Sequence, residues 1–343
     1  MKMPSEFFNN LHKRRYFNDT MDIINCNRDV INYTDILFYF RSMKKISKKY
    51  PLKELEALFD PLNLYPFYYF MPFLFICDTC DKTQYLQKIR YVGIISTLIA
   101  RRTIITDLFA DEQYEQLISR NMGGLRKECL GYYLQIIDLE INNILSRIFT
   151  ETDSFYVIYN RRFGEYINLM LREKEISPLI CIDEVEFTKY AVGKSILHLL
   201  VTDMVLYITK KEELTQQFDD MMKSFIMYLT LQDDVLDIIE DIRKQQPSHF
   251  YPWISDGNII ENIDENVEKA LLIKFYLGGG IERCEAFVDK YVKDIKSALE
   301  KINYPLKSWL KVIEAMSLKT KDKLNSFKEV KNKLIFLLSQ QQD

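Results

Sequence analysis

The stretch Met227–Lys244, with the sequence MYLTLQDDVLDIIEDIRK, carries the most informative pattern in the chain. Its apolar residues recur with the period of an α-helix, which predicts a helix that is largely embedded in protein. Asp233, Asp237 and Asp241 fall at positions i, i+4 and i+8, so three carboxylates would line one face of this helix. Like charges one turn apart destabilise a helix by roughly 0.2–0.5 kcal/mol per pair, and a bound cation would relieve that cost. The alternative is a solvated acidic stripe.

The same helical period recurs along most of the 343 residues, and turn-forming residues are scarce. Ten glycines and nine prolines make up less than half of their usual combined share of about 12%. Sandwiches, barrels and glycine-rich nucleotide folds need more turn residues, so the composition predicts an all-α protein. Amphipathic helices are expected at 33–48, 52–59, 66–80, 84–112, 113–121, 124–149, 155–175, 184–209, 212–246, 258–276, 279–302, 306–316 and 318–339.

No repeat, linker or change of composition marks a boundary between two domains. The expected organisation is a peripheral arm over residues 1–30 and one domain over 31–343, a single bundle of about a dozen helices. The most apolar run, Leu64–Cys77, is shorter than the roughly 18–20 residues that cross a bilayer, so no transmembrane segment is expected. The net charge of −3 does not favour binding to nucleic acid. Six cysteines at irregular spacing favour reduced thiols and hence a cytoplasmic location.

A second acidic pair lies in the first half of the chain. Asp107 and Asp111 are four residues apart in an otherwise apolar helix, and Glu112 follows them. Two helices that each present aspartates could hold Mg²⁺ between them, because Mg²⁺ prefers carboxylate oxygens together with phosphate oxygens. Such a site suits the ionisation of a diphosphate ester, since the metal neutralises the leaving group and an apolar pocket keeps water from the carbocation. Small or weakly polar residues continue the face of Asp107 toward the N-terminus: Thr103, Ala100 and Ser96.

These motifs resemble those of the trans-isoprenyl diphosphate synthase and class I terpene synthase superfamily. Asp107–Glu112, DLFADE, resembles the first aspartate-rich motif, DDxxDE, with Leu108 in place of the second aspartate. Gln232–Asp237, QDDVLD, is similar to the second motif, QDDxxD, and lies at the distance along the chain that is typical of the family. Lys194–Ser195 resembles a Lys-Thr pair that contacts diphosphate, and Gly278–Ile302 resembles a late GGIE-type helix.

The resemblance implies an isoprenoid synthase fold, with the bundle arranged around a deep central cavity, and it implies roles for particular residues. The catalytic and metal-binding residues would be Asp107, Asp111, Asp233 and Asp237, with Asp241 as a further ligand of about two or three Mg²⁺ ions. The cations that contact diphosphate would be Lys194, Arg120, Arg243 and Lys244. The residues that line the cavity would be Thr103, Ala100, Leu108 and Gln232.

Two departures from the family pattern bear on the reaction. Elongating members hold a second diphosphate with a basic GGKRxRP-like loop, but the corresponding stretch Phe67–Pro72 has no lysine or arginine. Ala100 stands where family members carry a histidine. Because an anion buried without a partner is costly, the sequence favours an enzyme that binds one prenyl diphosphate, with a chain of ten to twenty carbons. It would ionise this substrate as a terpene synthase does, and the carbocation would then cyclise or be quenched.

Other readings stay open. The chain lacks an NSE-type metal motif, and Asp237–Asp241, DIIED, followed by Phe250–Pro252, is also similar to squalene and phytoene synthases. A trans-isoprenyl diphosphate synthase or a squalene- or phytoene-type prenyltransferase is therefore the first alternative. Leu108, in place of a metal ligand, keeps a catalytically silent helical partner subunit as the second. A homodimer is usual in the resembled family and is possible here.

Overall fold

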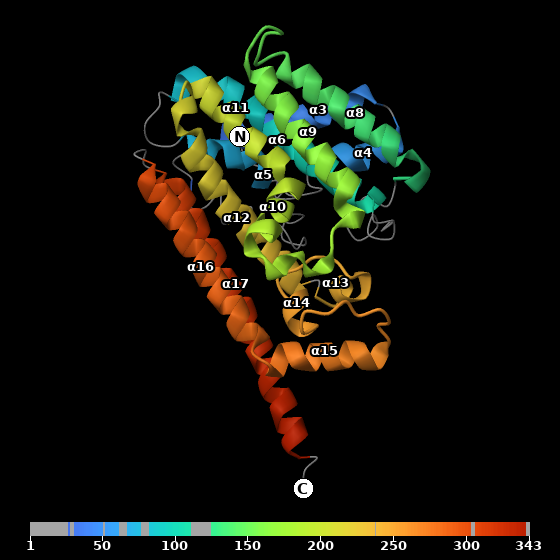
Figure 1. Cartoon of the computed structure of the whole chain (residues 1–343). Coiled ribbons are helices and arrows are strands. Elements are labelled where there is room, and N and C mark those ends of the chain that lie inside the picture. Colours follow the sequence, from blue (N-terminus) through green and yellow to red (C-terminus); the bar gives the residue numbers. More distant parts are fainter. Residues whose placement is uncertain are drawn as a thin grey trace. The chain divides into compact units, whose positions relative to one another are not determined.

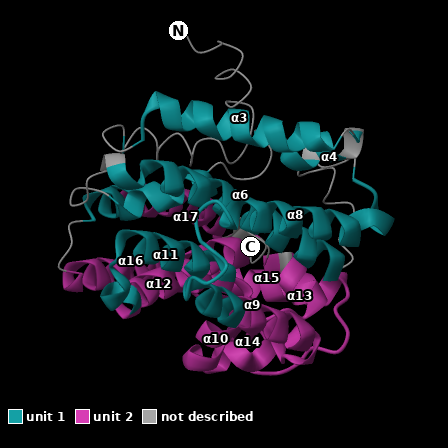
Figure 2. Ribbon diagram, turned by 90° about the horizontal axis from the view of Figure 1, so that it is seen from above, with its two compact units in different colours: residues 1–162, 197–215, 304–312 teal, residues 163–196, 216–303, 313–343 magenta. Residues whose placement is uncertain are grey.

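The computed structural model describes residues 27, 31–50, 52–61, 67–76, 82–110, 125–236, 238–302 and 306–340 (Figure 1). These residues form helices joined by connections without any strand, so the prediction of an all-α protein is confirmed for them. They divide into two compact units (Figure 2). Unit 1 comprises residues 1–162, 197–215 and 304–312, and unit 2 comprises residues 163–196, 216–303 and 313–343. The predicted arm over 1–30 lies outside the described residues apart from Asn27. The single domain and the central cavity stay predictions.

Unit 1 is built around one long helix, α6 (Lys82–Ala110). Its middle is buried on every side, with Ile95 and Leu98 at 0% exposure, because other elements of the unit pack around it. The elements that contact it are α3 (Tyr33–Lys49), α5 (Phe67–Phe70), the 3-10 helix η1 (Met71–Phe75) and α8 (Leu130–Leu145). The unit also contains α4 (Lys53–Phe59), the 3-10 helix η2 (Lys127–Cys129), the first part of α9 (Phe155–Arg172) and most of α11 (Ile196–Thr209).

Gly93 lets α5 pack closely on α6. A Cβ atom at this position would come within 2.5 Å of the Tyr69 carbonyl oxygen and within 2.7 Å of a carbon of the Tyr69 ring. Both approaches are too short for any real side chain, so the crossing of the two helices requires glycine here. Tyr69 is fully buried at the crossing and donates a hydrogen bond to the Asp35 carbonyl oxygen at 3.0 Å.

Unit 2 contains the helices that carry the second acidic motif. It includes α10 (Glu184–Lys194), α12 (Thr215–Leu236), α13 (Ile238–Lys244), α14 (Tyr251–Ile254), α15 (Glu265–Leu277), α16 (Gly280–Lys301) and most of α17 (Lys307–Ser339). The two long helices α16 and α17 run antiparallel, side by side (Figure 1). Three lysines of α17 pair with acidic residues of α16 in reverse order along the chain, at 2.7, 2.5 and 2.6 Å: Lys321–Asp289, Lys328–Glu285 and Lys331–Glu282.

Several predicted helices were wrong in their bounds. The predicted helix over 184–209 is α10 and α11, which separate at Ser195, and the one over 212–246 is α12 and α13. Within the predicted helix 66–80, the described residues 67–75 form α5 and η1, because Pro72 suits the first turn of a new 3-10 helix. The helix predicted over 258–276 begins at Glu265, where the Asp264 carboxylate accepts hydrogen bonds from two backbone amides and caps the helix. The two stretches 306–316 and 318–339 form the single helix α17.

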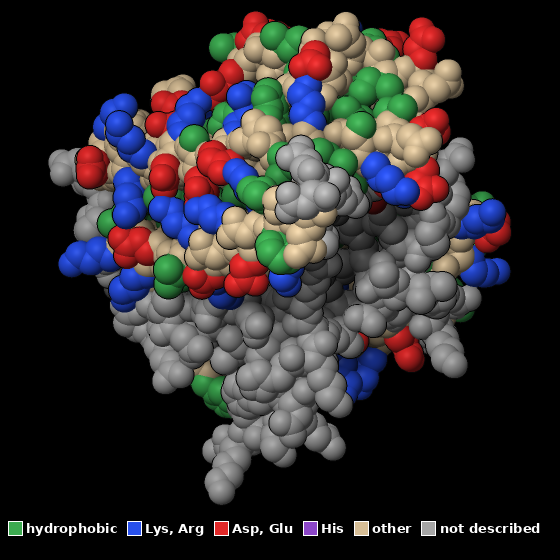
Figure 3. All heavy atoms as spheres, turned by 90° about the horizontal axis from the view of Figure 1, so that it is seen from below, with side chains coloured by type: hydrophobic (Ala, Val, Ile, Leu, Met, Phe, Trp, Pro, Cys, Tyr) green, Lys and Arg blue, Asp and Glu red, His purple; other side chains and the backbone are tan. Residues whose placement is uncertain are grey.

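Among the described helices, none is long and apolar enough to cross a membrane by itself, and only α10 and α11 counted together meet the requirements of length and composition. Acidic and basic side chains lie interspersed on the face drawn in Figure 3. Several described lysines are paired within unit 2, for example Lys269 with Glu265 at 2.7 Å and Lys296 with Glu314 at 3.1 Å.

Candidate metal and diphosphate site

The first acidic motif begins in the last turn of α6. Asp107 is partly exposed there, whereas the next residue, Leu108, is 1% exposed and packs inside unit 1. Leu108, at the second position of the motif, is thus a core residue. Of these two neighbours, only Asp107 reaches solvent. Asp111 and Arg120 lie outside the described residues, so their predicted roles stay predictions.

The face of α6 that continues from Asp107 toward the N-terminus is largely buried. Residues four, seven and eleven positions apart share one face of an α-helix, which places Thr103, Ala100 and Ser96 below Asp107. Thr103 is partly exposed, and its hydroxyl donates to the Ile99 carbonyl oxygen at 3.0 Å. Ala100 is 3% exposed and Ser96 is fully buried, so little open space borders these two residues. Their predicted role in lining a substrate cavity stays a prediction.

The second acidic motif spans the end of α12 and the whole of α13. Asp233 is exposed near the end of α12, whereas Asp241, on α13, is 8% exposed. α12 ends at Leu236 and α13 begins at Ile238, and the residue between them lies outside the described part of the chain, so the prediction that Asp233, Asp237 and Asp241 line one face of one helix stays a prediction. Asp237 lies outside the described residues.

Asp234, the second of the three aspartates in QDDVLD, faces the interior. It was assigned no role from the sequence. Its carboxylate oxygen Oδ2 accepts hydrogen bonds from the backbone N–H and from ring Nδ1 of His249, each at 2.6 Å. The other ring nitrogen of His249 lies 3.0 Å from the hydroxyl of Tyr291 on α16. All three residues are at most 7% exposed. The histidine comes from the connection after α13, and no local pattern in the sequence predicts this partner.

Each of the three described cations that were predicted to contact diphosphate has a carboxylate partner. Lys194 lies 2.6 Å from Glu173 and 5.7 Å from the centroid of the Tyr190 ring. The guanidinium of Arg243 donates two hydrogen bonds to Glu268, at 2.7 and 3.0 Å, and Lys244 lies 2.7 Å from Glu240. Exposed ion pairs contribute only about 0–1 kcal/mol, so a multiply charged anion could displace the carboxylates from Arg243 and Lys244.

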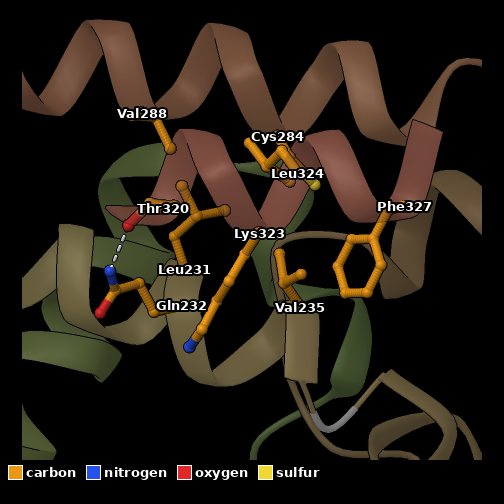
Figure 4. Close-up of a pocket in the computed structure, with 9 residues that line it drawn as sticks. All are labelled: Leu231, Gln232, Val235, Cys284, Val288, Thr320, Lys323, Leu324 and Phe327. Atoms are coloured by element: carbon orange, nitrogen blue, oxygen red, sulfur yellow. Dashed lines mark hydrogen bonds between the residues drawn. The ribbon is translucent and has the colours of Figure 1, made fainter. Parts of the chain in front are cut away.

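A pocket opens on another face of α12 (Figure 4). It is formed by Leu231, Gln232 and Val235 of α12, Cys284 and Val288 of α16, and Thr320, Lys323, Leu324 and Phe327 of α17. About 370 Å³ between these side chains is free of protein atoms, including the part that opens to solvent. The Gln232 amide donates to the hydroxyl of Thr320 at one end of the pocket, and Phe327 lies at the other end. Burial raises the pKa of the Cys284 thiol to about 12, so this thiol stays protonated and unreactive.

The described donors of the predicted metal site lie in the last turns of α6 and α12. Asp233 is exposed and Asp107 is partly exposed, and hard oxygen ligands of this kind fit Mg²⁺. Within the part of the chain that the structure describes, no three His, Cys, Asp or Glu side chains gather as a metal site. Because Asp107 belongs to unit 1 and Asp233 to unit 2, the meeting of the two motifs stays a prediction.

Comparisons with family models, with curated proteins and with solved structures give no match for this chain. The resemblance to isoprenoid synthases therefore rests on the motifs in the sequence, their order and spacing, and the all-helical architecture of the described residues.

Proposed function

We propose that the chain is a Mg²⁺-dependent class I terpene synthase that ionises a prenyl diphosphate of ten to twenty carbons. The observation that carries the proposal is the position of the two motifs on their helices. Asp107 and Asp233 each lie in the last turn of a long helix with a buried apolar face, and Asp233 is exposed there whereas Asp107 is partly exposed. Carboxylates at the ends of such helices suit a metal site at the mouth of an apolar interior.

The chain's own residues have two tasks in this reaction. The aspartates of both motifs hold oxygen ligands toward the substrate diphosphate, and Mg²⁺ bound there would neutralise the charge of the departing diphosphate. Buried apolar residues of α6, such as Ile95 and Ile99, exclude water from the protein interior below Asp107. A carbocation formed next to such a wall survives long enough to rearrange. The proposal requires that Asp107 and Asp233 reach the same diphosphate.

The stretch that corresponds to the basic loop of elongating synthases favours the terpene synthase over the prenyltransferase. It forms α5 and the start of η1, and its residues Phe70 and Met71 are 2% and 1% exposed. A second diphosphate would find no lysine or arginine in this stretch and would meet the buried core of unit 1. An elongating enzyme would need a cation there.

The decisive experiment incubates the protein with geranyl, farnesyl or geranylgeranyl diphosphate, with Mg²⁺ or with EDTA, and with or without isopentenyl diphosphate. We expect Mg²⁺-dependent release of diphosphate and terpene products without isopentenyl diphosphate, read by mass spectrometry. Longer prenyl diphosphates that form only with isopentenyl diphosphate would establish the prenyltransferase instead. No diphosphate release from any of the three substrates would favour the silent partner subunit.

Variants connect the activity to the motifs. Asp233→Asn and Asp237→Asn keep the size of the side chain and remove a negative charge, so we expect turnover to fall at least about a hundredfold, or about 2.7 kcal/mol of barrier. Asp107→Asn should lose a similar factor if both motifs bind one diphosphate. Asp220→Asn is the matched control, because Asp220 is also exposed on α12 but lies more than three turns before Asp233. Unchanged turnover in Asp233→Asn would contradict the assignment.

A further inference from the structure

The imidazole of His249 is buried, and aromatic rings from two helices of unit 2 pack against it. The ring of Phe187 on α10 meets it edge-on, with 4.7 Å between ring centroids, and the ring of Phe287 on α16 lies 5.1 Å away. An ionised carboxylate can only accept hydrogen bonds, so the Nδ1 that faces Asp234 carries the hydrogen. The other nitrogen, Nε2, lies within hydrogen-bond distance of the Tyr291 hydroxyl, at 3.0 Å. Both polar atoms of the ring are therefore satisfied inside unit 2.

The hydrogen bonds from His249 to Asp234 join two points of the chain, and two further aspartates of the second acidic motif lie between those points in sequence. Asp234 and His249 are 15 residues apart, and the chain between them carries Asp237 and all of α13 with Asp241. The backbone N–H and the ring of His249 bind the same oxygen of Asp234, so the contact fixes the direction of the chain as well as its position. The path of α13, which carries Asp241, is thereby tied to α12.

A second contact fixes the rotation of α12 at the motif. Gln232 donates from its amide to the hydroxyls of Tyr228 and Thr320, the first at 3.0 Å. Consecutive residues of an α-helix point about 100° apart. With Gln232 held on one side and Asp234 held on the other, the residue between them, Asp233, is directed outward, and it is the exposed member of the three.

We infer that His249 is a positioning residue for the second acidic motif, and that it acts through Asp234 to hold the exposed carboxylate of Asp233 in place before Mg²⁺ binds. The inference rests on the proposed function. A segment held by internal hydrogen bonds loses less conformational freedom on binding the metal, so its affinity is higher.

The test measures the binding of Mg²⁺ in the presence of inorganic diphosphate by titration calorimetry, which does not depend on turnover. His249→Asn keeps a donor near the position of Nδ1 and should bind Mg²⁺ within about threefold of the wild type. His249→Gln moves the amide toward the position of Nε2 and loses the ring bond to Asp234, so its Kd for Mg²⁺ should rise at least about tenfold. Tyr291→Phe is the control, because it changes a buried neighbour of His249 and leaves the bond to Asp234 in place. Its Kd for Mg²⁺ should stay within about threefold of the wild-type value.

The variants also separate positioning from general stability, because urea unfolding of each one shows whether it is folded under the conditions of the titration. Equal affinities in His249→Gln and the wild type would overturn the inference, and so would an equal loss in His249→Asn and His249→Gln. A wild type that binds no Mg²⁺ with diphosphate would overturn it together with the proposed function. Binding of Mg²⁺ without turnover of any prenyl diphosphate would contradict the terpene synthase alone.

Discussion

The imidazole of His198 on α11 stacks on the ring of Tyr68 on α5, with 4.7 Å between the ring centroids and an angle of 11° between the planes. Its Nδ1 atom is buried and has no hydrogen-bond partner among the described residues. Burial alone lowers the pKa of His198 to about 4. The ring is therefore neutral near pH 7 and behaves as an aromatic residue of unit 1.

His198 should make the protein sensitive to acid. Between its ordinary pKa of 6.5 and its folded value of about 4, the unfolded chain binds a proton that the folded chain does not bind. Stability is therefore lost as the pH falls through this window, and His198 should account for a loss of about 2 kcal/mol between pH 7 and pH 4.5. His198→Phe keeps a ring for the stack and should lose that much less stability over the same interval. Urea unfolding of both proteins at both pH values measures the difference, and parallel losses would contradict the shift.

Leu108 should not tolerate the aspartate that the resembled motif carries at its position. At 1% exposure the new carboxylate would be buried without a partner, so Leu108→Asp should lower the free energy of unfolding by several kcal/mol. Phe109→Asp is the control, because Phe109 is 50% exposed on the same turn and the change should cost less than about 1 kcal/mol. Thermal unfolding measures both. Wild-type stability in Leu108→Asp, or a gain in diphosphate release, would show that the first motif has another register.

Gly93 and Gly164 should respond to alanine in opposite directions. Gly93→Ala places a methyl group within 2.5 Å of the Tyr69 carbonyl oxygen and forces α5 away from α6, at a cost of about 1–3 kcal/mol. Gly164 lies within α9, and a Cβ there would meet nothing within 4 Å. Gly164→Ala should therefore stabilise the protein by up to about 1 kcal/mol through helix propensity. Denaturant midpoints give the sign of each change, and a stabilised Gly93→Ala would disprove the close packing of α5.

The ion pair between Arg162 and Asp203 is buried, at 5% and 4% exposure, with 2.8 Å between Nε and Oδ2. Arg162→Met leaves the Asp203 carboxylate without this guanidinium and should cost about 3–5 kcal/mol. The double variant Arg162→Met, Asp203→Leu removes both charges and should recover most of that loss. A double-mutant cycle in urea measures the coupling, and two losses that simply add would show that the pair contributes little.

The sequence alone determined most helices of this protein, because a helix is encoded locally by its apolar period and its caps. The predicted helix 33–48 is α3 (Tyr33–Lys49), which Asn32 and Asp35 close with a reciprocal capping box. The predicted helix 279–302 is α16 (Gly280–Lys301), which begins after Gly279 in a left-handed conformation with φ of 100°. The sequence also identified an acidic motif with residue types and spacing suited to Mg²⁺.

Only the tertiary structure decided what each residue of that motif does locally. Asp233 and Asp234 are adjacent and chemically identical, yet one is exposed and the other is buried against His249. The difference depends on a histidine 15 residues away and on a tyrosine 42 residues beyond it, and no local period records such partners. Likewise, the sequence predicted Lys194 to meet a diphosphate, but only the fold brings it to Glu173. Local periodicity determines where a helix forms, whereas the charge and burial of a side chain depend on which distant residues pack against it.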